Sequence, residues 1–188
     1  RAVFRIEESR PSFFAPFCSE KTKGIYLEAA LNAGILEELS ALRAMAPRAA
    51  LMWEVATQDV EEEENRPLLF RLIKQAGLYS VNLPEACQLF CADDEEGALL
   101  AIARFAVPCF FRVGEKGAYF VKGGRAVFVA SLVNGQTVDA TGCGNASTAA
   151  ALVGVAEGLP LAQAVSMGNV SAFFTARQYG PLQYAPAL

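Results

Sequence analysis

The chain has 188 residues, of which 53% are hydrophobic, 10% aromatic and 19% charged; its formal net charge is −4 and it contains no histidine. This length and composition correspond to one globular domain or a large part of a bigger one, and they exclude a disordered chain. The absence of histidine excludes Ser-His-Asp and Cys-His catalysis, imidazole bases and His-ligated zinc within this chain, so any proton transfer must use a carboxylate, Lys, Tyr, Cys or another chain.

The first third of the chain predicts an irregular segment, a helix and a strand. Residues 1–25 contain two prolines and are typical of the end of an extended segment, not of an independent unit. From 26 to 45, apolar residues recur at helical spacing, which predicts an amphipathic helix, either in one piece or divided at Gly34. The short apolar run 49–55, which follows Pro47, predicts a buried strand.

The middle of the chain alternates helices and strands. Residues 67–77 predict a helix, with Pro67 in its first turn and Gly77 at its end. The elements expected after it are a strand at 78–83, helices at 84–91 and 95–106, and a strand at 108–113. Because strands separated by helices usually pair in parallel, we expect an α/β fold with a parallel central sheet covered by helices on both faces. The acidic run 61–64 is expected at a solvated surface.

Beyond residue 113 the pattern changes to a hairpin followed by two helices. Segments 118–121 and 126–130 flank Gly123-Gly124, which is a hairpin signal. Together with the turn at 114–117, they predict a small antiparallel edge of three strands. The last expected elements are two Ala-rich helices, at 144–157 and 160–176.

The charge pattern and the cysteines indicate the partners and the compartment. Sixteen basic residues scattered among twenty acidic ones form no basic patch, so we expect no nucleic acid partner. Charged residues interrupt every apolar run before the roughly 18 residues that a membrane span needs, so no membrane partner is expected. Five separated cysteines without a complete zinc spacing favour reduced thiols in an intracellular, cytoplasmic protein. Because the chain begins at Arg1, an organelle-targeting segment before it stays open.

The strongest chemical signal lies at residues 138–146, where a polar loop with glycines opens into an Ala-rich helix. Gly142 and Gly144 allow the backbone to approach a ligand closely, and the free amides at a helix start bind anions. Such a site suits phosphoryl transfer, whose catalysis depends mostly on positioning and charge stabilisation. The alternative is a tight turn in which Thr141 or Asn145 caps the helix. This stretch by itself supports both interpretations equally.

Two further strand ends carry polar side chains. Asn82 and Glu85 lie where a predicted strand gives way to a helix, the position at which open parallel sheets bind ligands. An amide and a carboxylate one helical turn apart can reach a hydrated magnesium ion or its phosphate ligands, and the same pair also suits a helix cap with its capping-box partner. The turn 112–117 follows the next strand and suits either a nucleotide or a plain loop.

Together, and in this order, the three segments resemble the ribokinase-like (PfkB-type) family of carbohydrate and nucleoside kinases. Asn82-Leu83-Pro84-Glu85 is similar to the family's N-x-x-E motif, and residues 138–146 are similar to its D-T-x-G-A-G-D signature. Residues 111–118 resemble its nucleotide-side turn, usually written T-L-G-x-x-G. Gly168-Asn169 resembles the Asn that the family places beside the adenine. The likeness runs from about residue 26 to residue 181.

The resemblance implies a ribokinase-like fold and ATP-dependent phosphoryl transfer to a hydroxyl of a small-molecule sugar or nucleoside. It implies an anion hole formed by the backbone amides of Gly142, Cys143 and Gly144. The residues that it assigns to the nucleotide are Arg112 (where Thr is usual), Gly114, Lys116, Gly117 and Asn169. Those that it assigns to metal ions are Asn82 and Glu85, for magnesium and its water, and Asp139, for the monovalent cation that many members hold.

One departure from the family concerns the catalytic base. The final Asp of the signature takes the proton from the substrate hydroxyl, and the residue here is Asn145. An amide cannot accept that proton near neutral pH, and loss of a positioned base typically costs about 10²–10⁴-fold in rate. Trp53-Glu54 resembles the W-E-P variant of a fungal and plant branch, some members of which have Asn at this position.

Three hypotheses follow for the function. The first is a carbohydrate kinase with an altered or relocated base, and the second is a pseudokinase that acts as a structural or regulatory nucleotide-binding subunit. The third, an α/β domain without a ligand, agrees least with three motifs in family order.

The second departure concerns extent. Family members carry an N-terminal half with sugar-binding residues and a small β-sheet lid, almost all of which this chain lacks. We therefore expect residues 1–25 to be a remnant of that half, and residues 26–188 to be the nucleotide-binding C-terminal part of a ribokinase-like domain. The acceptor substrate is not assigned, and a homodimer and a larger assembly both stay open because the lid often mediates dimers.

Overall fold

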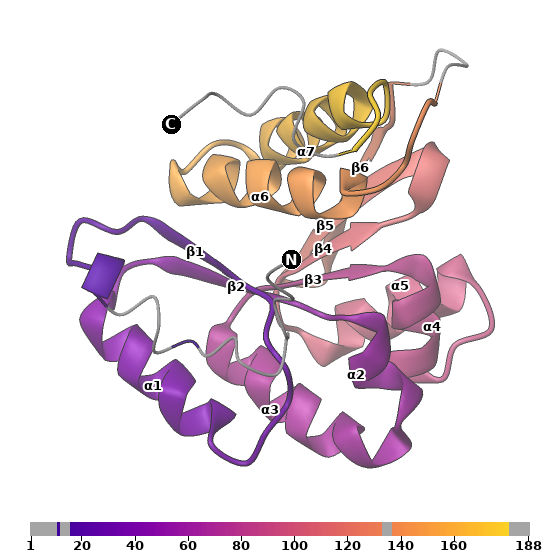
Figure 1. Cartoon of the computed structure of the whole chain (residues 1–188). Helices are drawn as coiled ribbons and strands as arrows, with labels where there is room; N and C mark the ends of the chain where they lie inside the picture. Colours follow the sequence, from indigo (N-terminus) through magenta and orange to yellow (C-terminus); the bar gives the residue numbers. More distant parts are fainter. Residues whose placement is uncertain (1–10, 12–15, 133–136, 181–188) are drawn as a thin grey trace.

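A computed structural model describes residue 11, residues 16–132 and residues 137–180 (Figure 1). The elements in chain order are β1 (Gly24–Leu27), α1 (Ile35–Met45), β2 (Ala50–Glu54), α2 (Thr57–Glu61), η3 (Glu63–Asn65), α3 (Arg66–Ala76), β3 (Tyr79–Asn82), α4 (Leu83–Phe90), α5 (Glu95–Phe105), β4 (Cys109–Arg112), η4 (Gly114–Lys116), β5 (Gly117–Lys122), β6 (Arg125–Ala130), α6 (Cys143–Ala156) and α7 (Leu161–Thr175). Here η3 and η4 are single 3-10 turns. No helix in the described ranges has the length and apolar character needed to cross a membrane.

The six strands form one sheet in the order β1-β2-β3-β4-β5-β6. The strands from β1 to β4 pair in parallel, while β4, β5 and β6 pair in antiparallel fashion. This arrangement confirms the α/β fold with a parallel sheet, and it confirms the three-stranded antiparallel edge. The parallel part follows from the helix that separates each strand from the next, because a crossover connection returns the chain to the same strand direction.

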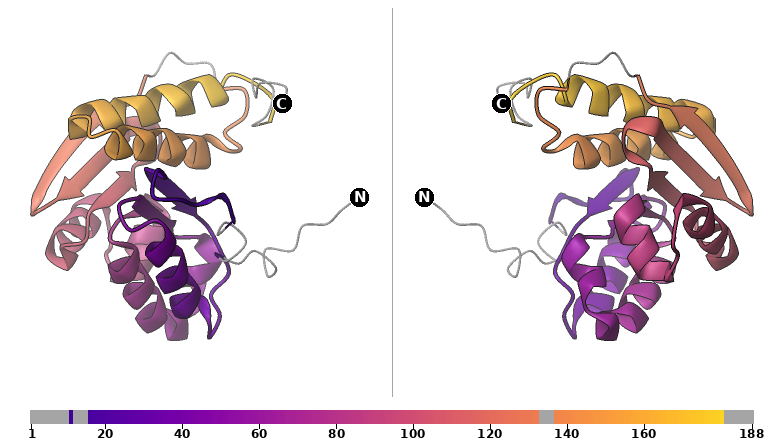
Figure 2. Two further views of the ribbon diagram at one scale, coloured as in Figure 1. Left: turned by 90° about the vertical axis from the view of Figure 1, so that its left-hand side faces the viewer. Right: turned by 90° about the vertical axis from the view of Figure 1, so that its right-hand side faces the viewer.

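Helices cover both faces of the sheet (Figures 1 and 2). Helices α6 and α7 pack together on one face, where α6 contacts β1, β2 and β4, and α7 contacts β5 and β6. The opposite face carries α1 to α5, with α3 against β2, α4 against β3 and α5 against β5. The helices of the two faces are therefore encoded in two blocks, one before and one after the hairpin.

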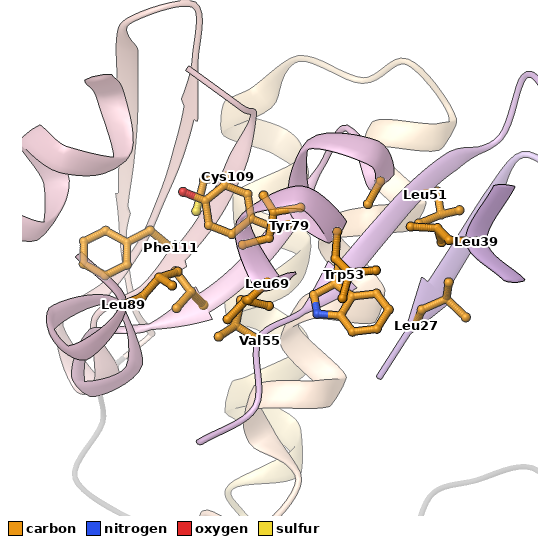
Figure 3. Close-up of a cluster of buried hydrophobic side chains, with 14 of the residues drawn as sticks. Leu27, Leu39, Leu51, Trp53, Val55, Leu69, Tyr79, Leu89, Cys109 and Phe111 are labelled. Carbon is orange, nitrogen blue, oxygen red and sulfur yellow. The ribbon is translucent and has the colours of Figure 1, made fainter. Parts of the chain in front are cut away.

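Neighbouring strand residues point to opposite faces and are buried on both. Trp53 and Phe111 belong to the larger hydrophobic cluster, beneath α1 to α5, where Figure 3 shows them with Tyr79. Their chain neighbours Met52 and Phe110 belong to the smaller cluster under α6 and α7. Because both faces exclude water, these strands are continuous apolar runs and not alternating ones, as a parallel sheet requires.

Most predicted elements are confirmed to within one or two residues, but the helix predicted for 26–45 is wrong over its first part. Residues 24–27 form β1, which pairs with β2 along its whole length, and the helix begins only at Ile35. Ile25 and Leu27 are both buried, so these residues follow the two-residue alternation of a strand and not the period of a helix. The acidic run 61–64 is exposed, as predicted, and the short helix α2, which ends at its first residue, was not predicted.

Candidate active site

Polar side chains gather at one edge of the sheet, where the parallel strands end. Glu54, Asn82 and Arg112 are the last residues of β2, β3 and β4, and Asn82 pairs directly with Arg112 in the sheet. Glu28 comes immediately after β1. Because all four strands run in the same direction, these four side chains come to the same edge, which is where open α/β sheets bind ligands.

A cavity of about 700 Å³ lies between this edge, the hairpin and the two C-terminal helices. The residues in its wall that the sequence assigned to a site are Asn82, Arg112, Gly114, Gly117, Cys143, Gly144 and Asn169. Small side chains, among them Ala118, Ser131, Ala172 and Ala176, form much of the remaining wall. The volume falls within the range of about 300–1,000 Å³ that is usual for small-molecule sites.

A second, polar cavity of about 230 Å³ adjoins the first. Its wall includes three carboxylates, Glu28, Glu54 and Glu85, together with Asn145. Asn82 and Arg112 belong to the walls of both cavities. The two side chains therefore stand where the larger and the smaller cavity meet.

The start of α6 borders both cavities and is not capped by a side chain. Gly142 precedes the helix in a left-handed conformation (φ 83°) and accepts a hydrogen bond from the Ala146 amide. The Cys143 amide donates to the Ala140 carbonyl at 3.2 Å, whereas the amides of Gly144 and Asn145 have no acceptor among the described residues. The expectation that Thr141 or Asn145 caps the helix is therefore wrong, whereas the tight turn at Gly142 is present, and free amides remain for an anion.

Arg112 places its guanidinium directly against this helix start. A Cβ atom at Gly144 would lie 2.2 Å from Arg112 Nη1, so only glycine leaves room for the arginine here. The guanidinium also forms an ion pair with the Glu54 carboxylate, and both side chains are largely buried. Burial raises the pKa of Glu54, and the charge of Arg112 opposes this rise. The pair fixes a positive charge beside the free amides of α6.

Asn82 and Glu85 form a reciprocal helix cap. The Asn82 side-chain oxygen accepts from the Glu85 amide at 2.9 Å, and Glu85 Oε2 accepts from the Asn82 amide at 3.1 Å. Glu85 Oε1 accepts from the Thr57 hydroxyl at 3.1 Å. The capping interpretation is confirmed, and it does not compete with ligand binding, because each carboxylate oxygen accepts more than one bond and Glu85 still faces the smaller cavity.

The residues expected at the nucleotide play different structural roles. Gly117 is required by the hairpin, because a Cβ there would lie 2.2 Å from the Val129 carbonyl oxygen. Asn169 is buried and donates both bonds of its amide group to β6, at 2.9 and 3.1 Å. Lys116 is exposed and pairs with Glu95 at 2.7 Å, outside both cavities. Gly114 and Gly117 thus line the larger cavity, and the Lys116 ammonium does not.

Asp139 organises the loop before α6. Its two carboxylate oxygens accept from the backbone amides of Thr141, at 2.8 Å, and Gly180, at 3.1 Å. The hydrogen bonds from Thr141, and after them the one from Gly180, lower the pKa of Asp139. Asp139 lines neither cavity, so its observed contacts are those of a loop-stabilising residue.

The sequence profile of the pfkB family of carbohydrate kinases matches residues 21–187 of this sequence. The chain belongs to this family. Comparison with curated proteins found no match. Solved structures of pfkB-like fold are similar, among them an adenosine kinase from Sinorhizobium meliloti (24% identity, TM-score 0.76) and a probable sugar kinase from Rhizobium etli (22%, TM-score 0.76). Each comparison covers 95% of this chain and 54% of the other.

A third solved structure holds ligands. The fructokinase from Vibrio cholerae, in a form with fructose, ADP and calcium, is 16% identical with a TM-score of 0.72, and the match covers 90% of this chain and 60% of that one. At these identities the likeness shows the fold alone. The pfkB chain described here spans a little over half the length of these structures.

The sequence resemblance predicts that Asn145 lies at the position of the family's base. Its side chain is exposed, lies in the wall of the smaller cavity and donates from Nδ2 to Glu28 Oε2 at 3.4 Å. Sequence reasoning missed Glu28, which fell inside the predicted helix 26–45, and it noted Glu54 only as a branch feature. The available signal was that a charged or amide residue ends or directly follows each parallel strand.

The residues at this edge fit the magnesium ion that the pfkB family implies. No group of three or more His, Cys, Asp or Glu side chains that could hold a metal occurs in the described part of the chain. Magnesium keeps several waters and usually takes one or two protein carboxylates plus substrate phosphates. Glu85, with its oxygens toward the smaller cavity, matches that donor set, and Asn82 beside it can bind a water or a phosphate.

Proposed function

We propose that this protein transfers the terminal phosphoryl group of ATP to a hydroxyl group of a sugar or nucleoside. The observation that carries the proposal is the meeting of the two cavities at the start of α6. The larger cavity has the size for a nucleotide, and the smaller one is lined by carboxylates and amides that suit a polyol. Family membership supports the same chemistry.

The start of α6 supplies the charge stabilisation that phosphoryl transfer needs. The free amides of Gly144 and Asn145 and the Arg112 guanidinium face the point where the cavities meet, so negative charge on the transferred group is met by fixed donors. Asn82 and Glu85 would hold magnesium, and the bound ion would supply further positive charge to stabilise the transferred group. Glu54 keeps Arg112 in place before any ligand binds.

The proposed class of acceptor rests on the ligands of similar solved structures and on the residues that line the smaller cavity. Solved structures of similar fold include a fructokinase with fructose and a nucleoside kinase with inosine. Both ligands carry hydroxyl groups, which can donate hydrogen bonds to the carboxylates of the smaller cavity. We therefore propose a sugar or nucleoside acceptor, with ATP, magnesium and, at the Asp139 loop, a monovalent cation.

A second candidate is a nucleotide-binding subunit that does not catalyse transfer. Asn145 favours it, because its amide cannot accept the proton of the attacking hydroxyl. Loss of that base would lower the rate by about 10²–10⁴-fold and would leave the larger cavity free to bind a nucleotide.

Turnover by the full-length protein, supplied with ATP, magnesium and either fructose, adenosine or inosine, tests the proposal. We expect phosphorylated product, and we expect Ala172→Trp, which fills the larger cavity, to abolish both turnover and the thermal shift caused by ADP. Phe174→Trp is the matched control, because Phe174 lies on the same helix, is exposed and lines neither cavity. A thermal shift without turnover would favour the second candidate, and turnover unaffected by Ala172→Trp would contradict the assignment of the cavity.

A further inference from the structure

We propose that Glu28 is the general base of this protein, held in place by Asn145. This inference rests on the proposed function, since it names the residue that accepts the proton in that reaction. The starting observation is the contact of 3.4 Å between Asn145 Nδ2 and Glu28 Oε2. A carboxylate oxygen therefore lies one hydrogen-bond length from the side chain that occupies the position of the family's base.

The position of Glu28 in the fold brings it to the acceptor side of the site. It follows β1 directly, so it lies at the same sheet edge as Glu54 and Asn82, and it is exposed in the wall of the smaller cavity. An exposed carboxylate is free to approach a bound ligand. Asn145 can only donate to it through Nδ2, so this hydrogen bond orients the carboxylate and leaves its proton-accepting capacity intact.

The other two carboxylates of the smaller cavity already have structural partners. Glu54 is 4% exposed and forms an ion pair with Arg112. Glu85 accepts from the Asn82 amide through one oxygen and from the Thr57 hydroxyl through the other. Glu28 differs from both, because the one side-chain hydrogen bond that it forms within the described residues is the bond from Asn145. It is therefore the carboxylate of this cavity that can accept a proton without breaking an ion pair or a helix cap.

The proposed step moves one proton and one phosphoryl group. The acceptor hydroxyl oxygen attacks the terminal phosphorus of ATP and forms a new O–P bond, while the bond from that phosphorus to the bridging oxygen breaks and its electron pair stays on ADP. The hydroxyl proton passes to the Glu28 carboxylate. Asn145 acts as a positioning residue, and Arg112 with the amides of α6 stabilises the negative charge.

The test compares four forms of the full-length protein: unmodified, Glu28→Gln, Asn145→Asp, and the double variant Glu28→Gln/Asn145→Asp. With the acceptor that gives turnover in the unmodified protein, we expect Glu28→Gln to lower kcat by about 10²–10⁴-fold. The Kd for ADP, measured by isothermal titration calorimetry, should stay within about twofold. The double variant returns a carboxylate to α6, so its kcat should exceed that of Glu28→Gln at least tenfold. Glu61→Gln, an exposed carboxylate outside both cavities, is the control for loss of a surface charge.

Two results would overturn this assignment while the proposed function stands. One is full turnover by Glu28→Gln. The other is loss of turnover in Glu28→Gln that the double variant does not recover, which would show that Glu28 binds the acceptor and does not accept its proton. Two other results would contradict the proposed function itself, and the assignment with it. In the first, the unmodified protein binds ADP but Asn145→Asp is the only form with turnover. In the second, none of the four forms has turnover.

Discussion

Arg112 and Glu54 form the one ion pair of the described residues in which both side chains are largely buried, with 13% and 4% of their surfaces exposed. A buried pair of this kind adds little net stability compared with apolar residues of the same size, because both charges lose their hydration. The ion pair instead fixes the position of the Arg112 guanidinium, which it holds against Gly144. Arg112 Nε and Glu54 Oε2 are buried and have no hydrogen-bond partner in the described ranges, so the pair is not fully satisfied.

Removing only one member of this pair should be costly. Arg112→Met leaves the Glu54 carboxylate buried and unpaired, so we expect the free energy of unfolding to fall by about 3–5 kcal/mol. Urea denaturation measures this loss. The double variant Arg112→Met/Glu54→Leu should recover most of it, and equal destabilisation in the single and double variants would contradict a paired role.

The titration of Glu54 predicts a pH dependence of stability. Burial raises the pKa of Glu54 above its ordinary value of 4.5. The folded protein therefore binds this proton more tightly than the unfolded chain, and the resulting stability is fully present below that ordinary value and is lost as the pH rises through the folded pKa. Relative to Glu54→Gln, the parent should lose stability in thermal melts as the pH rises above 4.5. The opposite trend would show that the charge of Arg112 outweighs burial.

At the scale of elements, the start of α6 depends on a residue without a side chain. Gly144→Ala would place a Cβ 2.2 Å from Arg112 Nη1, so the guanidinium must leave its position. We expect the Kd for ATP to rise at least tenfold, although alanine favours a helix over glycine by about 1 kcal/mol. Calorimetric titration of ATP with the variant and the parent checks this, and an unchanged Kd would show that Arg112 does not contact the phosphates.

The packing of α6 against α7 depends on a second close approach. A Cβ at Gly154 would lie 2.8 Å from the Cα and 2.9 Å from the Cβ of Ala164. Gly154→Ala should therefore destabilise the protein by about 1–3 kcal/mol through overpacking. Val153→Ala, an exposed position on the same helix, should change stability by less than about 0.5 kcal/mol and serves as the control in urea denaturation.

Elements with a strong local signal could be predicted from the sequence, whereas β1 could not. Helix α3 has Pro67 in its first turn and a left-handed Gly77 at its end, and it lies as predicted. Residues 24–27 match a strand only once their parallel pairing with β2 is known, because Leu27 also fits the helical spacing that continues to Leu42. Tertiary pairing decided this segment, and the error hid Glu28 inside a predicted helix.

The candidate site was predictable where the family motifs are local. Gly114, Gly117 and Gly144 line the larger cavity, as the sequence indicated. The contact of Asn145 with Glu28 joins residues 117 positions apart in the sequence, and no local sequence pattern predicts a contact between residues so far apart. The ammonium group of Lys116 was expected at the nucleotide and instead pairs with Glu95, the first residue of α5.

At the scale of the whole molecule, the proposed function assigns the nucleotide to the larger cavity and the acceptor to the smaller one. Asn145 lines only the smaller cavity, so Asn145→Asp should leave the thermal shift caused by ADP unchanged. At 100 times its Kd, ADP should stabilise both proteins by about 2.7 kcal/mol. A loss of the shift in Asn145→Asp, measured on the full-length protein, would show that the two cavities are not independent.

A crystal structure of the full-length protein with magnesium and a non-hydrolysable ATP analogue tests the central proposal most directly. We expect the base and ribose in the cavity of about 700 Å³ and the terminal phosphate at the start of α6, within hydrogen-bond distance of the Gly144 amide and the Arg112 guanidinium. A nucleotide bound elsewhere, or one whose phosphates point away from α6, would contradict phosphoryl transfer at this site.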